Sequence, residues 1–368
     1  MKADKKVLIS GYYGFDNSGD DAILKAIVKD FQKMDDKVKI LVLSKRPSHT
    51  EKMYGIKAIN RFQIHDIVKE MKNCDLFISG GGSLLQDGTS TRSIIYYLTL
   101  IKLALMNKKP VMIYANGIGP INKKFNRNFT RKILDKVDLI TLRDEDSRYY
   151  LKELQVKNPN IYVTADPVFT LEPSNNEKIE NIFKAEKIPL DKPLIGVSVR
   201  EWKSAKNLIS NISQAIEYMI KKFGVNVVLI PMHYPEDLDI SKKIYEKITI
   251  EGCFVVSEKY SVEDIMGIIR RLDMIIAMRL HSLIYAATQK VPMVGLIYDP
   301  KIEGFLKFIE MKYMCNVENA EVIELCSIID KAWNNKGNLK TKLKEKEDVF
   351  KEKALENVYM ALRLINGR

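Results

Sequence analysis

The chain has 368 residues, of which 46% are hydrophobic and 29% are charged, and its formal net charge is +12. This length predicts about two domains, and this composition is that of a globular protein with a sizeable core. Basic residues are spread along the chain without a cluster, which disfavours nucleic acid as a partner. The charge is equally consistent with anionic partners, such as phosphorylated substrates or a membrane face, and with a lysine-rich composition without functional meaning.

The N-terminal residues lead directly into the short apolar run Val7–Ile9, which is too short for the core of a signal peptide. The longest apolar stretch, from Ile94 to Met106, contains Lys102 and is shorter than the roughly 18 residues that a membrane-spanning helix needs. The four cysteines are scattered without C-x-x-C spacing, so neither a zinc site nor a disulfide framework is predicted. We therefore predict a cytoplasmic protein with free thiols.

In the first half, short apolar runs alternate with amphipathic stretches. The alternation predicts a parallel sheet with helices on both faces. The predicted strands are Val7–Ser10, Lys39–Leu43, Leu76–Ser79, Val111–Ala115, Leu139–Leu142 and Ile161–Thr164, and the predicted helices include Asp20–Met34, Ser93–Asn107 and Lys124–Lys136.

The alternation then pauses at a stretch that contains Pro167, Pro173, Pro189 and Pro193, and we interpret residues 171–192 as a linker. A second alternating series follows. Its predicted strands are Leu194–Val199, Val225–Pro231, Cys253–Val256, Met274–Ala277 and Met293–Ile297, and its predicted helices are Asn207–Phe223, Leu238–Thr249, Val262–Arg270 and His281–Gln289.

These patterns predict an α/β protein with two Rossmann-like parallel-sheet domains, at residues 1–170 and 193–335. The Lys/Glu-rich tail, residues 336–368, is predicted to form a C-terminal helix that packs back on the first domain. Ligands of such folds bind at the carboxyl ends of the strands, where the strand order reverses. Residues that directly follow strands are therefore the candidates for a site in a cleft between the domains.

Two glycine-rich loops follow predicted strands of the first domain. One spans residues 11–21 and contains Gly14, Asn17 and Asp20; the other spans residues 80–87 and contains Gly81, Gly82, Ser83, Gln86 and Asp87. Glycines allow the backbone to approach a ligand closely, and Gln86 and Asp87 can hydrogen-bond to sugar hydroxyls. Neither loop has the pattern of a dinucleotide-binding or Walker A motif. A capped turn with Asp20 as the N-cap is the alternative for the first loop.

Cationic and imidazole side chains follow strands of the second domain. They are Arg200, His233, Arg279, His281 and Lys301, and Arg143 follows a strand of the first domain. Arginine and lysine in this number suit a small anionic substrate with carboxylate and phosphate groups. An ion pair with a neighbouring carboxylate is an equally weighted reading of Arg143. No His/Cys/carboxylate cluster has metal-ligand spacing, so no catalytic metal is predicted.

Four collinear segments resemble motifs of the polysaccharide pyruvyltransferase family of the CsaB type. They are Gly11–Leu24, Ser79–Asp87, Arg279–Ser282 and Tyr298–Lys301, and they span most of the chain. The resemblance implies a GT-B-like fold with phosphoenolpyruvate as co-substrate and no cofactor. Arg279, His281 and Lys301 match the family's donor segment. Ser18 and Asp21 depart from the alanine and glutamate expected in the first motif.

The acceptor implied by the resemblance is N-acetylmannosamine on a lipid-diphosphate-linked secondary cell-wall polymer precursor. The product would be a 4,6-ketal that anchors surface-layer proteins, and the enzyme would work in the cytoplasm with peripheral contact at the inner, anionic membrane face. The first domain would be the acceptor side, with Gly14, Asn17, Asp20, Gly81, Gly82, Ser83, Gln86 and Asp87. The second would be the donor side, where His281, Arg279 and Lys301 are catalytic, and Arg143, Arg200, Arg279, Lys301 and His233 bind the donor.

His281 is the expected proton donor to the enol methylene, and Asp20 or Asp87 the expected acceptor of a hydroxyl proton. Two alternatives stay open. One is a GT-B glycosyltransferase using a nucleotide sugar, for which Glu303 is the only nearby acidic candidate for a ribose contact. The other is a non-catalytic protein that binds an anionic glycolipid. The fold alone does not separate these functions.

Overall fold

The structure is a computed structural model that describes residues 5–88 and 90–367. The chain divides into two compact units. Unit 1 consists of the described residues up to Thr170 and from Val349 onward, and unit 2 spans Leu171–Asp348. Among the described residues, no helix combines the length and the apolar composition needed to cross a membrane. All four cysteines are buried free thiols.

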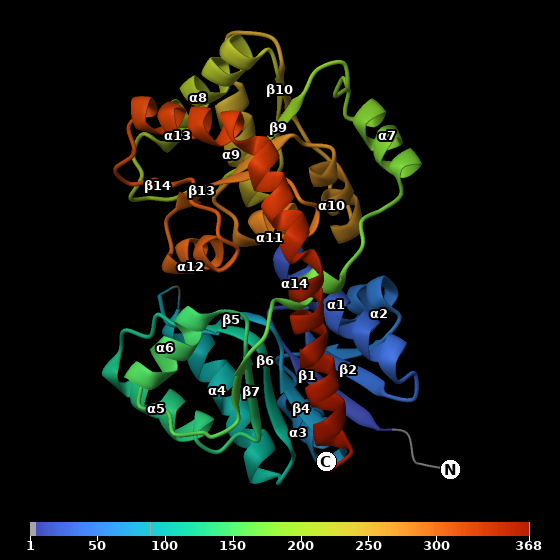
Figure 1. Ribbon diagram of the computed structural model, residues 1–368. Helices are drawn as coiled ribbons and strands as arrows, with labels where there is room; N and C mark the ends of the chain where they lie inside the picture. The colour runs from blue at the N-terminus through green and yellow to red at the C-terminus, as the bar shows by residue number, and fades with distance from the viewer. Residues whose placement is uncertain (1–4, 89, 368) are drawn as a thin grey trace. The chain divides into compact units, whose positions relative to one another are not determined.

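Unit 1 contains a parallel sheet of eight strands in the order β3-β2-β1-β4-β6-β7-β8, with β5 paired to β6 (Figure 1). The strands are β1 Lys6–Ser10, β2 Lys39–Ser44, β3 Lys57–Asn60, β4 Leu76–Ser79, β5 Gly82–Leu85, β6 Val111–Ile118, β7 Leu139–Leu142 and β8 Ile161–Val163. The helices are α1 Ser18–Met34, α2 Pro47–Tyr54, α3 Ile64–Asn73, α4 Thr91–Met106, α5 Lys124–Leu134 and α6 Glu145–Glu153, followed by the 3-10 turn Pro167–Thr170.

The core of unit 1 explains why its central strands are continuous apolar runs in the sequence. Leu8, Phe77 and Ile113 of β1, β4 and β6 pack with Ile67 of α3 and Leu98 of α4 in one cluster. Every residue of β4 and β6 is buried. A parallel strand covered on both faces has no solvent side, so it shows no alternation of polar and apolar residues.

Unit 2 contains a six-stranded parallel sheet in the order β11-β10-β9-β12-β13-β14. Its strands are β9 Leu194–Ser198, β10 Asn226–Leu229, β11 Cys253–Val255, β12 Met274–Ala277, β13 Met293–Ile297 and β14 Met314–Asn316. Its helices are α7 Asn176–Ala185, α8 Leu208–Phe223, α9 Glu236–Tyr245, α10 Val262–Arg270, α11 Leu280–Thr288, α12 Pro300–Phe308 and α13 Val322–Asn334.

The last helix, α14 (Lys336–Ile365), ends on unit 1. Asn357 is fully buried there, accepts a hydrogen bond from Thr164 at 2.8 Å and donates one to the carbonyl of Ala165 at 3.1 Å. The Phe350 ring lies 5.1 Å from that of Phe169. The prediction of a C-terminal helix that packs back on the first domain is confirmed, as is the α/β class with two Rossmann-like parallel sheets.

Several elements differ from the sequence prediction. Helix α1 begins at Ser18 rather than Asp20, because the side chain of Asn17 accepts hydrogen bonds from the amides of Gly19 and Asp20 and is the cap. The segment 171–192, predicted as a linker, contains α7 and belongs to unit 2. The short strands β3, β5 and β14 were not predicted; β3 and β14 lie at sheet edges, where few residues are buried and the apolar pattern is weak.

Each sheet reverses its strand order at one point, and several candidate residues follow the strands on either side of it. In unit 1 the reversal lies between β1 and β4, and in unit 2 between β9 and β12. The loops after β1 and β4 are the two glycine-rich loops, and the segments after β9 and β12 begin near Arg200 and Arg279. The glycine-rich segments, Arg200 and Arg279 therefore follow the strands at which ligands bind in doubly wound sheets, whereas Arg143, His233 and Lys301 follow β7, β10 and β13.

Asp30 of α1 makes the stability of the fold depend on pH. Burial is the largest influence and raises the pKa of Asp30 to about 7, against a hydrogen bond from Thr170 and nearby lysines that lower it. The unfolded chain releases this proton near its ordinary pKa of 3.8, so the folded state holds more protons between about pH 4 and pH 7. The contribution of Asp30 to stability is therefore complete below pH 4 and is lost as the pH rises to about 7.

We expect Asp30→Asn to remove this dependence, because the amide does not titrate. The gap between the melting temperatures of variant and wild type should widen by several degrees, in favour of the variant, from pH 5 to pH 8. Thermal unfolding followed by circular dichroism across this range measures it. A gap that stays constant with pH would show that Asp30 does not titrate in this window.

Candidate functional site

The two glycine-rich loops of unit 1 lie against each other over a buried tyrosine. A Cβ atom at Gly80 would stand 2.3 Å from the hydroxyl oxygen of Tyr13, which is 1% exposed, so no larger residue fits there. Gly82 has φ +93, and a Cβ there would stand 3.3 Å from Oδ1 of Asp20. The loop after β4 thus runs close to the first turn of α1 and brings Asp20 and Gly82 together.

Asp87, by contrast, makes hydrogen bonds that hold two segments of unit 1 together. Its carboxylate accepts hydrogen bonds from the amides of Asn122 and Lys123, at 2.7 and 3.0 Å, and from Nδ2 of Asn126 at 2.8 Å. Partial burial raises the pKa of Asp87, but these bonds outweigh it and hold the pKa below its ordinary value. Asp87 therefore ties the segment after β5, which contains Gln86, to the start of α5. These contacts weaken the case for Asp87 as a proton acceptor.

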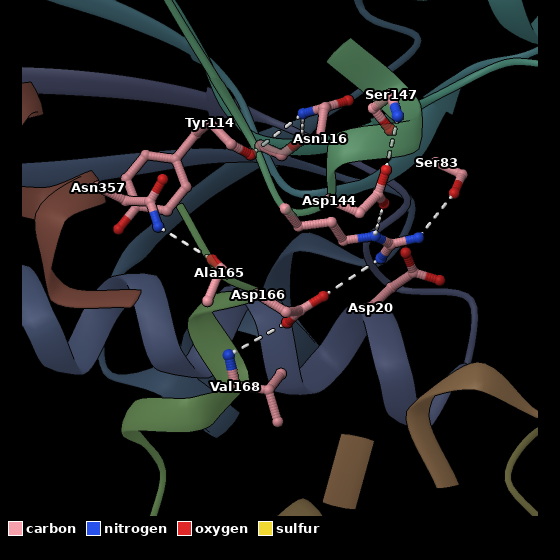
Figure 2. Close-up of polar contacts among 12 residues, drawn as sticks. Asp20, Ser83, Tyr114, Asn116, Asp144, Ser147, Ala165, Asp166, Val168 and Asn357 are labelled. Carbon is pink, nitrogen blue, oxygen red and sulfur yellow. Dashed lines mark hydrogen bonds and ion pairs between the residues drawn. The ribbon is translucent and has the colours of Figure 1, made fainter. Parts of the chain in front are cut away.

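Arg143 is buried at the end of β7 and held by acidic and hydroxyl groups of unit 1. Nη1 lies 3.2 Å from Oδ2 of Asp166, Nη2 donates to the hydroxyl of Ser83 at 3.0 Å, and Nε lies 3.7 Å from Oδ2 of Asp144. Figure 2 draws the polar contacts of Asp166, Asp144 and Ser83 as dashed lines. Arg143 thus contacts Ser83, one of the predicted acceptor residues, and belongs to unit 1, whereas the other predicted donor residues belong to unit 2.

In unit 2, Arg279 lies between β12 and α11 and is oriented by a buried carboxylate. Its Nε donates to Oδ2 of Asp237 at 2.8 Å, and its Nη2 pairs with Oδ1 of the same residue. The side chains are 14% and 1% exposed, respectively. An ion pair in which Nε and Nη2 each contact one carboxylate oxygen fixes the plane of the guanidinium.

Both predicted histidines of unit 2 are partly buried near strand ends. His233 follows β10, and its Nδ1 lies 3.4 Å from Oε2 of Glu236. His281 is the second residue of α11, with its ring 6.3 Å from that of Tyr285. The next residue, Ser282, hydrogen-bonds to Ser198 at the end of β9 at 2.8 Å, which fixes the start of α11 against the neighbouring strand.

Arg200 and Lys301 are the remaining predicted cationic residues of unit 2. Arg200 donates to the hydroxyl of Tyr298 at 3.3 Å and lies over its ring. Asp299 caps α12, accepting from the amide of Lys301, and Pro300 is the first residue of the helix. Nζ of Lys301 lies 3.0 Å from the Asp299 carboxylate. That carboxylate offsets the unfavourable position of a lysine at a helix N-terminus.

The order of the strands brings these residues to one edge of the sheet. The strands β10, β9, β12 and β13 are neighbours in this order. They are followed by His233, Arg200, Arg279 with His281, and Lys301.

A family model described as polysaccharide pyruvyl transferase matches residues 17–300, which is more than half of the chain. The chain belongs to the polysaccharide pyruvyl transferase family. A curated relative is the amylovoran biosynthesis protein AmsJ of Erwinia amylovora, 22% identical over an alignment of 276 residues that covers 69% of this chain. The match spans 64% of the length of AmsJ.

Solved structures similar to this pyruvyl transferase family member show its fold. The UDP-GlcNAc 2-epimerase of Neisseria meningitidis bound to UDP-GlcNAc has a TM-score of 0.69 at 13% identity, covering 97% of this chain and 100% of its own. Anabaena HepE in complex with UDP and glucose has a TM-score of 0.67 at 11% identity, covering 99% and 100%. At these identities the likeness shows the GT-B-like fold alone.

Three residues that hold candidate site residues in place were not predicted from the sequence. Asp237 and Asp166 hold Arg279 and Arg143, and nothing in their local sequence distinguishes them from other acidic residues. The third is Arg61, which is 6% exposed, donates to the carbonyl of Gly11 at 2.9 Å and lies 5.2 Å from the ring centroid of Phe15. Arg61 thereby fixes the start of the first glycine-rich loop.

Proposed function

We propose that this protein transfers the pyruvyl group of phosphoenolpyruvate to two hydroxyl groups of a sugar. The observation that carries the proposal is the row of His233, Arg200, Arg279, His281 and Lys301 along four neighbouring strand ends of unit 2. Phosphoenolpyruvate carries a carboxylate and a phosphate, and guanidinium and ammonium groups are the donors that bind both. Family membership supports the same chemistry.

The reaction proposed is the formation of a cyclic ketal. A proton is added to the methylene carbon, C2 becomes oxocarbenium-like, and one sugar hydroxyl adds to it. The bond between C2 and the phosphate oxygen breaks, and the second hydroxyl adds to C2. Of the two hydroxyl protons, one balances the proton taken up by the methyl group, and the other leaves with the phosphate. His281 is the proposed proton donor, and Arg279 and Lys301 hold the anionic groups.

The acceptor that we propose is N-acetylmannosamine of a lipid-diphosphate-linked cell-wall polymer precursor, reached at the cytoplasmic face of the membrane. The product would be the 4,6-ketal used to anchor surface-layer proteins. The glycine-rich loops of unit 1, with Asp20 beside Gly82, are the proposed acceptor surface.

Acceptor-dependent release of phosphate from phosphoenolpyruvate, measured across several lipid-linked disaccharides, tests the function. Release with at least one aminosugar acceptor is expected, and release with none would contradict the proposal. Thermal shift separates it from a glycosyltransferase, because a true ligand raises the melting temperature. Stabilisation by phosphoenolpyruvate supports pyruvyl transfer, whereas stabilisation by UDP alone would favour a nucleotide-sugar enzyme.

Between the two candidate proton acceptors, the geometry favours Asp20. We expect Asp20→Asn to lower turnover by about a hundredfold with little change in melting temperature, because the amide is not a base but keeps the shape of the side chain. Asp87→Asn should lower the melting temperature and leave turnover of the folded enzyme largely intact, since Asp87 fastens Asn122, Lys123 and Asn126. Turnover and thermal unfolding of both variants provide the comparison, and the opposite pattern would exchange the two roles.

A further inference from the structure

Asp237 is a fully buried acid outside every motif of the sequence. It is 0% exposed and is the second residue of α9. Its Oδ2 accepts hydrogen bonds from Nε of Arg279 at 2.8 Å and from the amides of Met232 and His233 at 3.2 and 3.1 Å. Three donors to one buried oxygen fix this carboxylate in place.

The contacts of Asp237 join the segments that follow two strands, one on each side of β9. Met232 and His233 follow β10, Arg279 follows β12, and β9 lies between these two strands. One carboxylate therefore ties the segment that carries His233 to the segment that carries Arg279. The pairing is selective, because Asp237 takes the Nε edge of the guanidinium, with Nε and Nη2.

The other edge of Arg279 stays available. Within residues 5–88 and 90–367, Nη1 of Arg279 has no hydrogen bond or ion pair, and the side chain is 14% exposed. The Nη1–Nη2 edge carries two parallel N–H bonds, the geometry that binds a planar carboxylate or a phosphate at two points. A guanidinium fixed by one carboxylate presents this edge with little loss of rotational freedom on binding.

We propose that Asp237 is a positioning residue that orients Arg279 so that its Nη1–Nη2 edge binds an anionic group of the donor. The inference rests on the proposed function only for the identity of that donor. Asp237 itself contacts no substrate and acts through Arg279. Because the same carboxylate holds the amide of His233, its loss should also loosen the segment after β10.

Binding of phosphoenolpyruvate by calorimetry tests the proposal on the whole protein. We expect Asp237→Asn to weaken binding roughly tenfold or more, as loss of a carboxylate that orients a ligand-binding side chain does elsewhere. Asp239→Asn is the matched control, an exposed acid in the same helix turn, and should bind as the wild type does. Unchanged binding by a folded Asp237→Asn protein would overturn the proposal.

A double-mutant cycle separates positioning from a purely structural role. If Asp237 acts through Arg279, then Asp237→Asn should have little further effect on affinity in an Arg279→Ala background. Effects that multiply in the double variant would overturn the proposal. If Asp237→Asn does not fold, Asp237→Glu keeps the charge but shifts the carboxylate by one methylene. Weakened binding by a folded Asp237→Glu protein supports the proposal, and wild-type affinity contradicts it.

Titration with inorganic phosphate as a second probe distinguishes failure of the proposed donor from failure of the proposed role of Asp237. If the wild type binds phosphate but not phosphoenolpyruvate, the proposed donor is wrong, and the same variants titrated with phosphate still test Asp237. If the wild type binds neither anion, the anion-binding role of Arg279 fails, and the proposal for Asp237 fails with it.

Discussion

Replacing His281 by alanine is expected to reduce turnover by about a hundredfold or more while phosphoenolpyruvate still binds. The methylene carbon of an enol phosphate is a weak base, so ketal formation depends on a positioned acid. Alanine removes that acid without removing Arg279 or Lys301, the cations proposed to hold the donor. The measurements are the rate of acceptor-dependent phosphate release at saturating substrates and the affinity for phosphoenolpyruvate by calorimetry.

His65→Ala is the matched control for this variant. His65 is exposed on α3 of unit 1, so its loss should leave both rate and affinity unchanged. Near-normal turnover of His281→Ala would rule out the proton-donor role. A loss of affinity as large as the loss of rate would instead indicate that His281 binds the ground state of the donor.

The parts of the fold that the sequence predicts are those fixed by local pattern. The strands β4, β9 and β12 are buried along their whole length, so each reads as an unbroken apolar run. Because the strands are parallel, the residue after each run lies at the carboxyl edge of its sheet. The position of Arg279 at that edge could thus be predicted without knowing the order of the strands.

What could not be predicted depends on contacts between distant residues. Asp237 meets Arg279 across 42 positions, and Asp166 meets Arg143 across 23. No period of the sequence links such residues, because their pairing follows from the order of strands in the sheet. The contacts of Asp87 show the same limit, since its partners in the segment after β6 lie 35 and 36 positions away.

Asp166→Ala is expected to cost about 3–5 kcal/mol of unfolding free energy, the largest stability effect that we foresee. The side chains of Arg143 and Asp166 are 5% and 2% exposed, so water does not replace the lost carboxylate. Alanine would leave the guanidinium buried without its main counter-charge and would also remove the acceptor of the Val168 amide. Urea unfolding followed by circular dichroism measures the loss.

Glu145→Ala is the control, because Glu145 and Arg148 form an exposed pair at 2.8 Å that should contribute about 1 kcal/mol or less. An Asp166→Ala loss no larger than that would show that the pair does not stabilise unit 1. The double variant Arg143→Met, Asp166→Leu removes both charges and should recover much of the lost stability. Its turnover then decides the role of Arg143: a stable but inactive protein indicates contact with substrate, and a stable, active one indicates that Arg143 serves the scaffold.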